Sequence, residues 1–272
     1  MSEPAGRPAP KGPPPYLSQI LGSAFRDAQE QRLLKHVRES PLPRHLAIIM
    51  DGNRRFAKSH GLLVEQGHEK GRDKLEELLN WCLEIGLRIM TVYALSTENF
   101  ERPKEELAPL MALFARSFHD IAVDERVHKN KIRVRAFGNR AILPPEVVAG
   151  IERAEAATRE YDRYFYNVAI AYGGRDEIVL AIRTIAEEVR AGRLRPQDIT
   201  QEMVSRHLYT ADLPDPDLVF RTSGEERISN FLLWQTAYAE LYFADVMWPG
   251  LSKVDFLRAI RDFQVRQRRY GT

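Results

Sequence analysis

The sequence is poor in cysteine, with Cys82 as its one thiol among 272 residues. A single thiol cannot form an internal disulfide, and such sparing use fits a reducing cytosolic setting. Cys82 lies in an apolar stretch without an evident basic neighbour, which favours a small buried hydrophobic residue over a nucleophile. These features exclude a disulfide-stapled scaffold and argue against thiol catalysis.

Long hydrophobic runs are also missing. No stretch reaches the roughly 18 apolar residues that a membrane-spanning helix needs. Residues 1–15 are rich in Pro, Gly and Ala and lack the apolar core of a signal peptide, so we predict a disordered tail there. We expect a cytoplasmic protein with at most peripheral membrane contact.

Neither sign of charge dominates. Lys and Arg number 40 against 38 Asp and Glu, which gives a net charge of +2. A nucleic-acid-binding module would carry a basic stripe with interleaved aromatic residues, so we expect no nucleic-acid partner. The length suits one domain with a sizeable core. The functional meaning of the arginines must then come from where they lie.

Apolar strands alternate with helical segments after a first helix. Residues 16–40 form the predicted N-terminal helix, which Pro41 and Pro43 stop, and residues 41–272 form the predicted main domain. The expected strands are His45–Met50, Ile89–Leu95, Ile132–Phe137, Phe165–Tyr172, Leu218–Phe220 and Leu241–Val246. The expected helices are Glu69–Ile85, Glu105–His128, Pro145–Tyr161, Asp176–Ala191 and Gln201–Leu208, with a basic helical end at Gln264–Tyr270. This alternation predicts a single-domain α/β fold with a mostly parallel sheet of about six strands and helices on both faces.

The first strand delivers a carboxylate, a glycine and two arginines to one point, at Asp51, Gly52, Arg54 and Arg55. A strand end followed by a helix start offers unpaired backbone N–H groups, which suit a phosphate. Asp51 would repel that phosphate unless a divalent metal lay between them, and Mg²⁺ binds in this way. Taken alone, a turn with solvated arginines explains the stretch equally well.

Two further clusters follow strands. Residues 221–231 bring Arg221 and Arg227 together with hydroxyls and a glycine, and residues 96–103 follow the second strand. Arginine matches phosphate oxygens with its planar fork. Because open α/β sheets bind ligands at the carboxyl ends of their strands, we expect the three loops to form one site.

The chain resembles the cis-prenyltransferases, the undecaprenyl diphosphate synthase family, from about His45 to Gly271. Four motifs carry the resemblance: DGNRRFA at 51–57, STENFERP at 96–103, YGGRDEI at 172–178 and RTSGEERISNFLLWQTAYAELYF at 221–243. The order Asn53-Arg54-Arg55-Phe56 is similar to the archaeal and eukaryotic branch, because most bacterial members have Gly before a single Arg and Trp after it.

The resemblance implies a Mg²⁺-dependent prenyltransferase that adds isopentenyl diphosphate units to an allylic diphosphate, each with a cis double bond. For the archaeal-like branch it implies geranylgeranyl diphosphate as primer and a long polyprenyl diphosphate, the precursor of a glycosyl carrier lipid. A short-chain synthase and a non-catalytic subunit of a two-subunit enzyme are the alternatives. Such subunits lose the first aspartate and the basic cradle, and both are intact here.

The resemblance also implies roles for individual residues. Asp51 is the central carboxylate and a metal ligand, Glu240 is a second metal carboxylate, and Asn99 takes part in the catalytic step as an orienting group. The proton acceptor stays open between Asp51 and the released diphosphate. The substrate-binding residues implied are Gly52, Asn53, Arg54, Arg55, Phe56, His68, Ser96, Thr97, Glu98, Phe100, Arg102, Arg221, Arg227, Ile228 and Ser229.

One position departs from the family. Many members carry an arginine shortly before the equivalent of His68, where this chain has Val64. Lys58 or Arg54 is the candidate replacement.

Two expectations concern the product and the assembly. The residues Leu107, Leu110, Met111, Phe114 and Phe118 fall on one helical face, which is ordinary core by pattern and the wall of a product tunnel by resemblance. The ending Arg269-Tyr270-Gly271 is similar to a family pattern that reaches across a twofold dimer, so we expect a homodimer.

Overall fold

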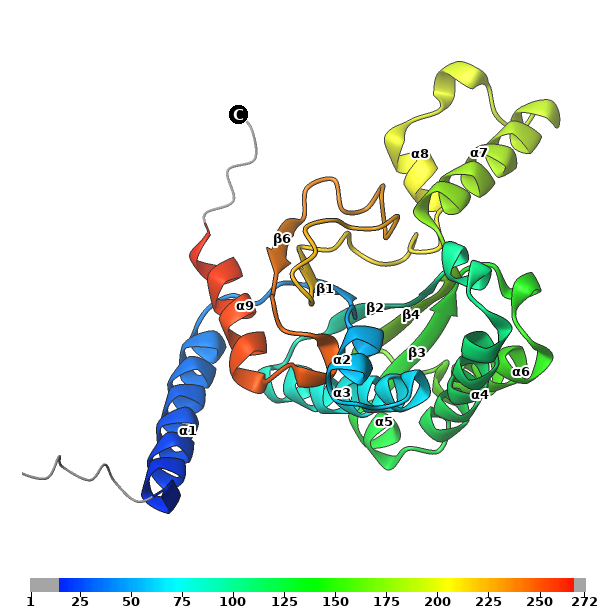
Figure 1. The fold of residues 1–272 in the computed structure, drawn as a ribbon. Coiled ribbons are helices and arrows are strands. Elements are labelled where there is room, and N and C mark those ends of the chain that lie inside the picture. The colour runs from blue at the N-terminus through cyan, green and yellow to red at the C-terminus, as the bar shows by residue number, and fades with distance from the viewer. Residues whose placement is uncertain (1–14, 267–272) are drawn as a thin grey trace, which may run out of the picture.

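The computed structural model describes the backbone of residues 15–266 and the side chains of residues 27–266. Its six strands form one sheet in the order β3-β4-β2-β1-β5-β6, and every neighbouring pair is parallel (Figure 1). The strands are β1 (His45–Ile49), β2 (Ile89–Ser96), β3 (Ile132–Phe137), β4 (Tyr164–Tyr172), β5 (Leu218–Arg221) and β6 (Glu240–Phe243). The predicted α/β class and parallel sheet are confirmed. β3 has the predicted bounds, and the other five strands differ from prediction by one to three residues at an end.

The central strand shows why the sheet is buried on both faces. All five residues of β1 are buried. Leu46 and Ile48 belong to the larger hydrophobic cluster, and Ala47 and Ile49 belong to a smaller one. Successive side chains of a strand point to opposite faces, so an uninterrupted apolar run is what a two-sided parallel sheet requires.

Helices cover the larger cluster. They are α1 (Pro15–Glu39), α3 (Val64–Ile85), α4 (Lys104–Ile121), α5 (Glu125–Asn130), α6 (Pro145–Thr158) and α9 (Lys253–Val265). The short helix α2 (Asn53–Ser59) packs on α3. The helices α1 and α9 lie side by side (Figure 1), and the Gln264 amide donates to the carbonyls of Val37 and Ser40 at 3.0 Å each. Among the described helices, none is long and apolar enough to cross a membrane.

The other face differs from the prediction of helices on both sides. Its cluster is small and aromatic, and its outer members include Phe231 and Leu232 from the segment between β5 and β6. That segment contains no helix. The remaining helices, α7 (Gly174–Arg190) and α8 (Gln201–Arg206), project from one corner of the molecule (Figure 1). A loop thus replaces a helical layer over the strands that carry the site.

Several helices begin or end at other residues than predicted. The helix predicted over Glu105–His128 is two helices, α4 and α5, because the Asp124 side chain accepts a hydrogen bond from the Arg126 N–H at 2.8 Å and starts a new helix. The helix α9 was not predicted over residues 253–263. The predicted basic helix at 264–270 begins inside the end of α9, and residues 267–270 lie outside the described residues.

Candidate active site

The three loops predicted to meet do so because their strands are neighbours. β2, β1 and β5 lie next to one another and run parallel, so their carboxyl ends share one edge of the sheet. From β1 the chain builds the sheet outward through β2, and it later returns to the other side of β1 with β5. The site therefore lies where the strand order reverses, the usual place for a ligand in such sheets.

Asp51 stands at the centre of this edge. Its Oδ2 accepts a hydrogen bond from Arg221 Nη2 at 2.8 Å and lies 3.3 Å from Arg55 Nη2. Thr222 ties the backbone of the same residue, since its hydroxyl accepts from the Asp51 N–H at 3.0 Å and donates to the Asp51 carbonyl at 2.7 Å. The carboxylate is thus fixed between two guanidinium groups while 27% of the side chain stays exposed.

The loop after β5 is held in strained backbone conformations. Ser223, Ser229, Asn230 and Leu232 have φ values of 81°, 47°, 63° and 45°, which place them in the left-handed region. Arg221 supports the loop from within, because its Nη1 donates to Ser229 Oγ at 2.7 Å and to the Arg227 carbonyl. Strain of this kind clusters at functional sites, and backbone N–H groups in such turns form anion-binding concavities.

The first helix after the aspartate rests directly on α3. An added Cβ at Gly67 would lie 2.5 Å from the Asn53 carbonyl oxygen, and one at Gly71 would lie 2.4 Å from Asn53 Oδ1. The first turn of α2 therefore packs where α3 has no side chains. Because α2 has only seven residues, its dipole is short, and the arginines carry most of its attraction for an anion.

Glu106 organises the opposite wall and was not predicted. Its Oε1 lies 3.0 Å from Arg102 Nη1, 3.6 Å from Arg54 Nε and 3.9 Å from His68 Nε2. The spacing of four residues between Arg102 and Glu106 was visible in the sequence as a helical ion pair. The convergence of three cationic or titratable groups on one carboxylate depends on the fold.

His68 points into this region as a neutral imidazole. Burial lowers its pKa from the ordinary value of 6.5, and the charge of Arg102 lowers the pKa further, so the neutral form dominates at pH 7. Its Nε2 is buried without a hydrogen-bond partner. A buried polar nitrogen without a partner is costly, and a ligand oxygen or a water would satisfy it.

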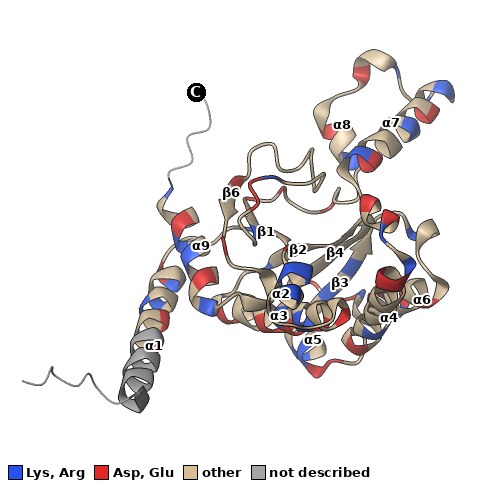
Figure 2. Cartoon of the chain, in the orientation of Figure 1, with Lys and Arg blue, Asp and Glu red and all other residues tan. Residues whose placement is uncertain are grey.

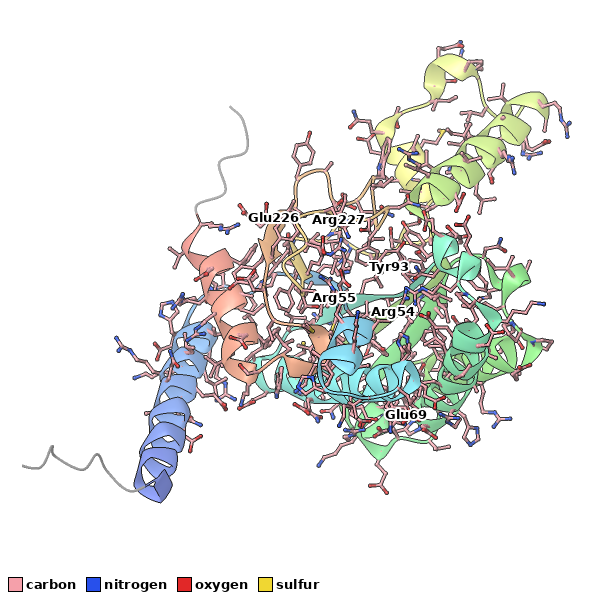
Figure 3. The ribbon with its side chains drawn as sticks, in the orientation of Figure 1. Arg54, Arg55, Glu69, Tyr93, Glu226 and Arg227 are labelled. Atoms are coloured by element: carbon pink, nitrogen blue, oxygen red, sulfur yellow. The ribbon has the colours of Figure 1, made fainter. Side chains whose placement is uncertain are left out.

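These walls enclose a cavity of about 1050 Å³. Six cationic side chains line it against two carboxylates, a balance that suits diphosphates. Figure 3 shows Arg54 and Arg55 on α2 and Arg227 on the loop after β5, and Figure 2 shows the basic residues of α2 in the whole chain. The lining residues that the sequence predicted are Asp51, Gly52, Asn53, Arg54, Arg55, His68, Ser96, Glu98, Asn99, Arg102, Arg221, Arg227 and Ser229.

Four predicted substrate residues do not line the cavity. Phe56 stacks on His60 with ring centroids 4.0 Å apart, and Thr97 Oγ1 donates to Asp176 Oδ2 at 3.0 Å. Phe100 packs against the larger hydrophobic cluster and Ile228 against the smaller one. These four side chains contact neighbouring protein groups, and their role in substrate binding stays a prediction.

The predicted metal pair is not formed within one chain. Glu240 begins β6 opposite Leu218, three residues before Arg221 in the neighbouring strand, so it lies ~10 Å along the sheet from the Asp51 edge. Its carboxylate accepts from Arg266 Nη1 at 2.9 Å. Among the described residues, no group of three or more His, Cys, Asp and Glu could hold a metal.

Asp51 alone still fits a magnesium ion that a diphosphate brings with it. Both arginine contacts end on Oδ2, so Oδ1 is the oxygen that a cation could take. Mg²⁺ commonly binds through one carboxylate together with water and substrate phosphates.

Val64, which stands where many family members have an arginine, also lines this cavity. Val64 lines it from the first turn of α3, and Lys58 lines it from the last turn of α2. The presence of Lys58 in the lining fits its predicted role as the replacement for the missing arginine, which stays a prediction.

Asn230 is a lining residue that the sequence did not single out. It links two loops, because its Nδ2 donates to Glu98 Oε1 at 2.8 Å.

An apolar cavity of about 130 Å³ continues from the polar one. Both are lined by Met50, Asn53, His68, Ala94 and Leu110. Leu110, Phe114 and Phe118 face it as predicted, whereas Leu107 and Met111 do not line it. The face of α4 is rotated slightly from the prediction and continues through Leu113 and Ile121, because helical positions three and four apart share a face.

Comparisons with known proteins identify the family that the chain matches. The family model described as "Putative undecaprenyl diphosphate synthase" matches residues 49–271. The chain is 54% identical over 242 residues to the tritrans,polycis-undecaprenyl-diphosphate synthase (geranylgeranyl-diphosphate specific) of Methanopyrus kandleri, which covers 89% of each protein. It is 53% identical over 256 residues to the enzyme of the same name from Pyrococcus horikoshii, covering 94% of this chain and 97% of that one.

Solved structures match as well. Lavandulyl diphosphate synthase from Lavandula x intermedia, solved with dimethylallyl diphosphate, is 36% identical with a TM-score of 0.82. A "probable undecaprenyl diphosphate synthase" from Campylobacter jejuni is 34% identical with a TM-score of 0.70. Each match covers 85% of this chain and 99% of the other.

Proposed function

The chain belongs to the undecaprenyl diphosphate synthase family of prenyltransferases, and on that premise we propose that it is a cis-polyprenyl diphosphate synthase. It adds isopentenyl diphosphate repeatedly to an allylic diphosphate primer. One observation carries the proposal: a cationic cavity around Asp51 and Arg221 opens into an apolar cavity of the kind a growing hydrocarbon needs.

The reaction breaks the allylic C–O bond, forms a carbon–carbon bond with the isopentenyl double bond and releases a proton and diphosphate. Diphosphate leaves only when its growing negative charge is stabilised. The positive charges that would stabilise it belong to Arg54 and Arg55 on α2 and Arg102 after β2. Contacts with Asp51 and Glu106 hold these guanidinium groups in place before a substrate binds. Preorganised cations of this kind contribute most where water is excluded.

The loop after β5 is the proposed site of isopentenyl diphosphate. Arg221 is 4% exposed and anchors the loop, whereas Arg227 is exposed toward the cavity. Holding the two substrates in a fixed relation makes the bimolecular step effectively unimolecular.

Magnesium is the proposed cofactor, with Asp51 as its protein ligand, and when bound it would neutralise the leaving diphosphate as a Lewis acid. Asn99 is the proposed orienting group. Its amide oxygen accepts from the Ser96 N–H at 3.2 Å, so the amide nitrogen is the part that remains to contact a substrate. Asp51 and the released diphosphate remain the two candidate proton acceptors.

The primer proposed is geranylgeranyl diphosphate. The archaeal relatives carry that specificity in their names, and the Asn53-Arg54-Arg55-Phe56 order supports the same branch. A long product is proposed for the same reason. The short-chain alternative is favoured by one observation, the likeness in fold to lavandulyl diphosphate synthase, and the product analysis below separates the two.

A homodimer is the proposed assembly. Val179, Leu180 and Ile182 on α7 are 45%, 45% and 56% exposed, and neighbouring exposed aliphatic side chains often mark an interface. The tail at 269–271, which lies outside the described residues, keeps its predicted role across the dimer. Any membrane contact would be peripheral and would come through the lipid product.

The test is product analysis with purified protein. Labelled isopentenyl diphosphate is supplied with geranyl, farnesyl or geranylgeranyl diphosphate, in Mg²⁺ or in excess chelator, and products are measured by mass. We expect a long polyprenyl diphosphate ladder, strongest with geranylgeranyl diphosphate and lost in chelator. No extension of any primer would overturn the proposal, and products that stop after one or two additions would favour the short-chain enzyme.

A further inference from the structure

The apolar cavity ends at charged side chains. From the residues that it shares with the polar cavity, it runs between α3 and α4 over Val92 and Val168 of the sheet. On α3 the lining passes from His68 to Glu76, about two helical turns farther. At that far end the lining residues are Arg72, Glu76, Asp120, Asp124 and Arg126. A cavity that only held a hydrocarbon chain would not need charged residues in its lining.

Arg126 joins the two sides of this end. Its Nη2 lies 3.1 Å from Glu76 Oε2 on α3, and its Nε lies 3.0 Å from Asp124 Oδ1 at the start of α5. The Arg126 and Glu76 side chains are each 47% exposed, so they form the outer layer. Inside them lies Tyr166, whose pKa is raised by burial and by the charge of Glu76. Figure 2 shows charged residues of both signs where α3 passes α5.

The break between α4 and α5 places Arg126 there. Arg126 lies in the first turn of α5, two residues after the Asp124 cap, and not on a continuation of α4. Asp124 caps α5 and also binds the Arg126 side chain, so one residue both turns the chain and holds the guanidinium across the cavity end. The break between α4 and α5, which the sequence pattern did not predict, thus also places charged side chains at the end of the cavity.

We propose that Arg126, held by Glu76 and Asp124, is a displaceable gate at the end of the product tunnel and limits product length. This inference rests on the proposed function. An exposed ion pair is weak, whereas each added five-carbon unit gains hydrophobic free energy when it is buried. A chain that fills the cavity meets the ion pair, and further elongation requires Arg126 to move aside. Removing the gate therefore lengthens the product without changing the first additions.

The experiment compares Arg126→Ala with Arg116→Ala. Arg116 makes the matched ion pair, because it joins α4 to α3 as Arg126 joins α5 to α3. Its Nη2 lies 3.7 Å from Glu69 Oε1, both side chains are more than half exposed, and Arg116 does not line the apolar cavity. The helix cap survives in Arg126→Ala, since Asp124 accepts from the backbone N–H of residue 126. Glu76→Gln weakens the gate from the other side, and Arg126→Lys keeps its charge.

The readout is the mass distribution of products from geranylgeranyl and isopentenyl diphosphates, with the initial rate of the first addition. We expect the most abundant product of Arg126→Ala and of Glu76→Gln to lengthen by at least one five-carbon unit. Arg126→Lys should stay near the parent, Arg116→Ala should match it, and the first-addition rates should agree within about twofold.

An unchanged distribution in Arg126→Ala and Glu76→Gln, made by a parent that elongates normally, would overturn the gate alone. The same lengthening in Arg116→Ala would also overturn it, because any loosening of α3 against α4 would then suffice. If Arg126→Ala fails to fold, Glu76→Gln decides. A parent that extends no primer would instead refute the proposed function and the gate with it.

Discussion

At the residue scale, the site depends on one carboxylate among arginines. Asp51 binds Arg221, a guanidinium that is almost wholly buried, and it also meets Arg55 from the following helix. The aspartate therefore orients both groups, and under the proposed function it also binds the metal. Removing its charge should affect catalysis far more than folding, because Arg221 keeps its bonds to Ser229 and Arg227.

We predict that Asp51→Asn lowers kcat by at least about 100-fold, the scale seen when one preorganised electrostatic group is lost. Circular dichroism should show an intact fold. Glu101→Gln is the control, because Glu101 is an exposed acid on the neighbouring loop that does not line the cavity, and it should keep activity within about twofold. Turnover of Asp51→Asn within about tenfold of the parent would contradict this role.

His45 gives a second prediction, for stability. It is fully buried at the start of β1, where its ring nitrogens contact Thr91 Oγ1 and the Pro214 carbonyl at 2.7 Å each. Burial lowers the pKa of His45 from 6.5 to about 4. Between these values the unfolded chain binds the proton and the folded chain does not, so His45 stabilises fully above pH 6.5 and loses its contribution as pH falls to 4.

Denaturant unfolding at pH 7 and pH 4 measures this effect. The parent should lose about 3 kcal/mol more unfolding free energy over the interval than His45→Gln does, from the 1.36 kcal/mol that one pKa unit represents. Carboxylates titrate in both proteins and cancel in the comparison. Equal losses in the two proteins would show that His45 is not held neutral.

The substrate-site residues inside the long motifs at strand ends could be predicted from the sequence, and twelve of them line one cavity together with His68 on α3. Glu106 lies outside the motifs and Asn230 lies inside one, but neither was singled out, because their importance comes from the side chains that the fold brings to them. Conversely, a place in a motif does not ensure that a residue lines the cavity. Phe56 contacts His60 and Thr97 contacts Asp176, and neither lines it.

At the scale of elements, the close packing of α2 on α3 positions the arginines. Gly71 makes room for the Asn53 side chain, and the Trp248 indole donates to the Gly71 carbonyl at 2.8 Å. We predict that Gly71→Ala lowers kcat/KM for the allylic primer at least tenfold, because a Cβ only 2.4 Å from Asn53 Oδ1 must displace the first turn of α2.

Gly150→Ala is the matched control on α6. Its Cβ would lie 3.2 Å from both the Ala115 carbonyl oxygen and Phe118 Cβ, a tight contact that involves no residue lining the polar cavity. Steady-state kinetics and thermal melting of both variants should separate a shift in stability from a loss of turnover. Parental kcat/KM in Gly71→Ala would mean that the position of α2 does not control the arginines.

The alternation of strands and helices was predictable because most residues of the strands are apolar, although β3 carries Arg133 and Arg135. The layer over the second face was not, because segment 222–239 covers it with buried side chains such as Phe231 and has no helical period. The α4–α5 break could have been anticipated from Asp124 as a capping residue, but the apolar pattern continued through it.

At the scale of the whole molecule, the proposed dimer makes each site depend on both chains. We predict that deleting residues 269–272 weakens use of isopentenyl diphosphate and leaves the dimer intact by sedimentation. Mixing this variant with Asp51→Asn should partly restore activity, because each heterodimer would pair one intact Asp51 with a tail from the other chain. If activity does not recover after verified subunit exchange, the tail acts within its own chain or has no role in catalysis.

Under the proposed function, the protein adds isopentenyl units repeatedly, each with a cis double bond, while the chain grows from the polar cavity into the apolar one. The most direct measurement is the geometry of the new double bonds, determined by ¹³C NMR on product made from geranylgeranyl diphosphate and labelled isopentenyl diphosphate. We expect every labelled unit to be cis and the primer's own trans bonds to be retained. Labelled trans units, or no labelled chain at all, would contradict the proposed function.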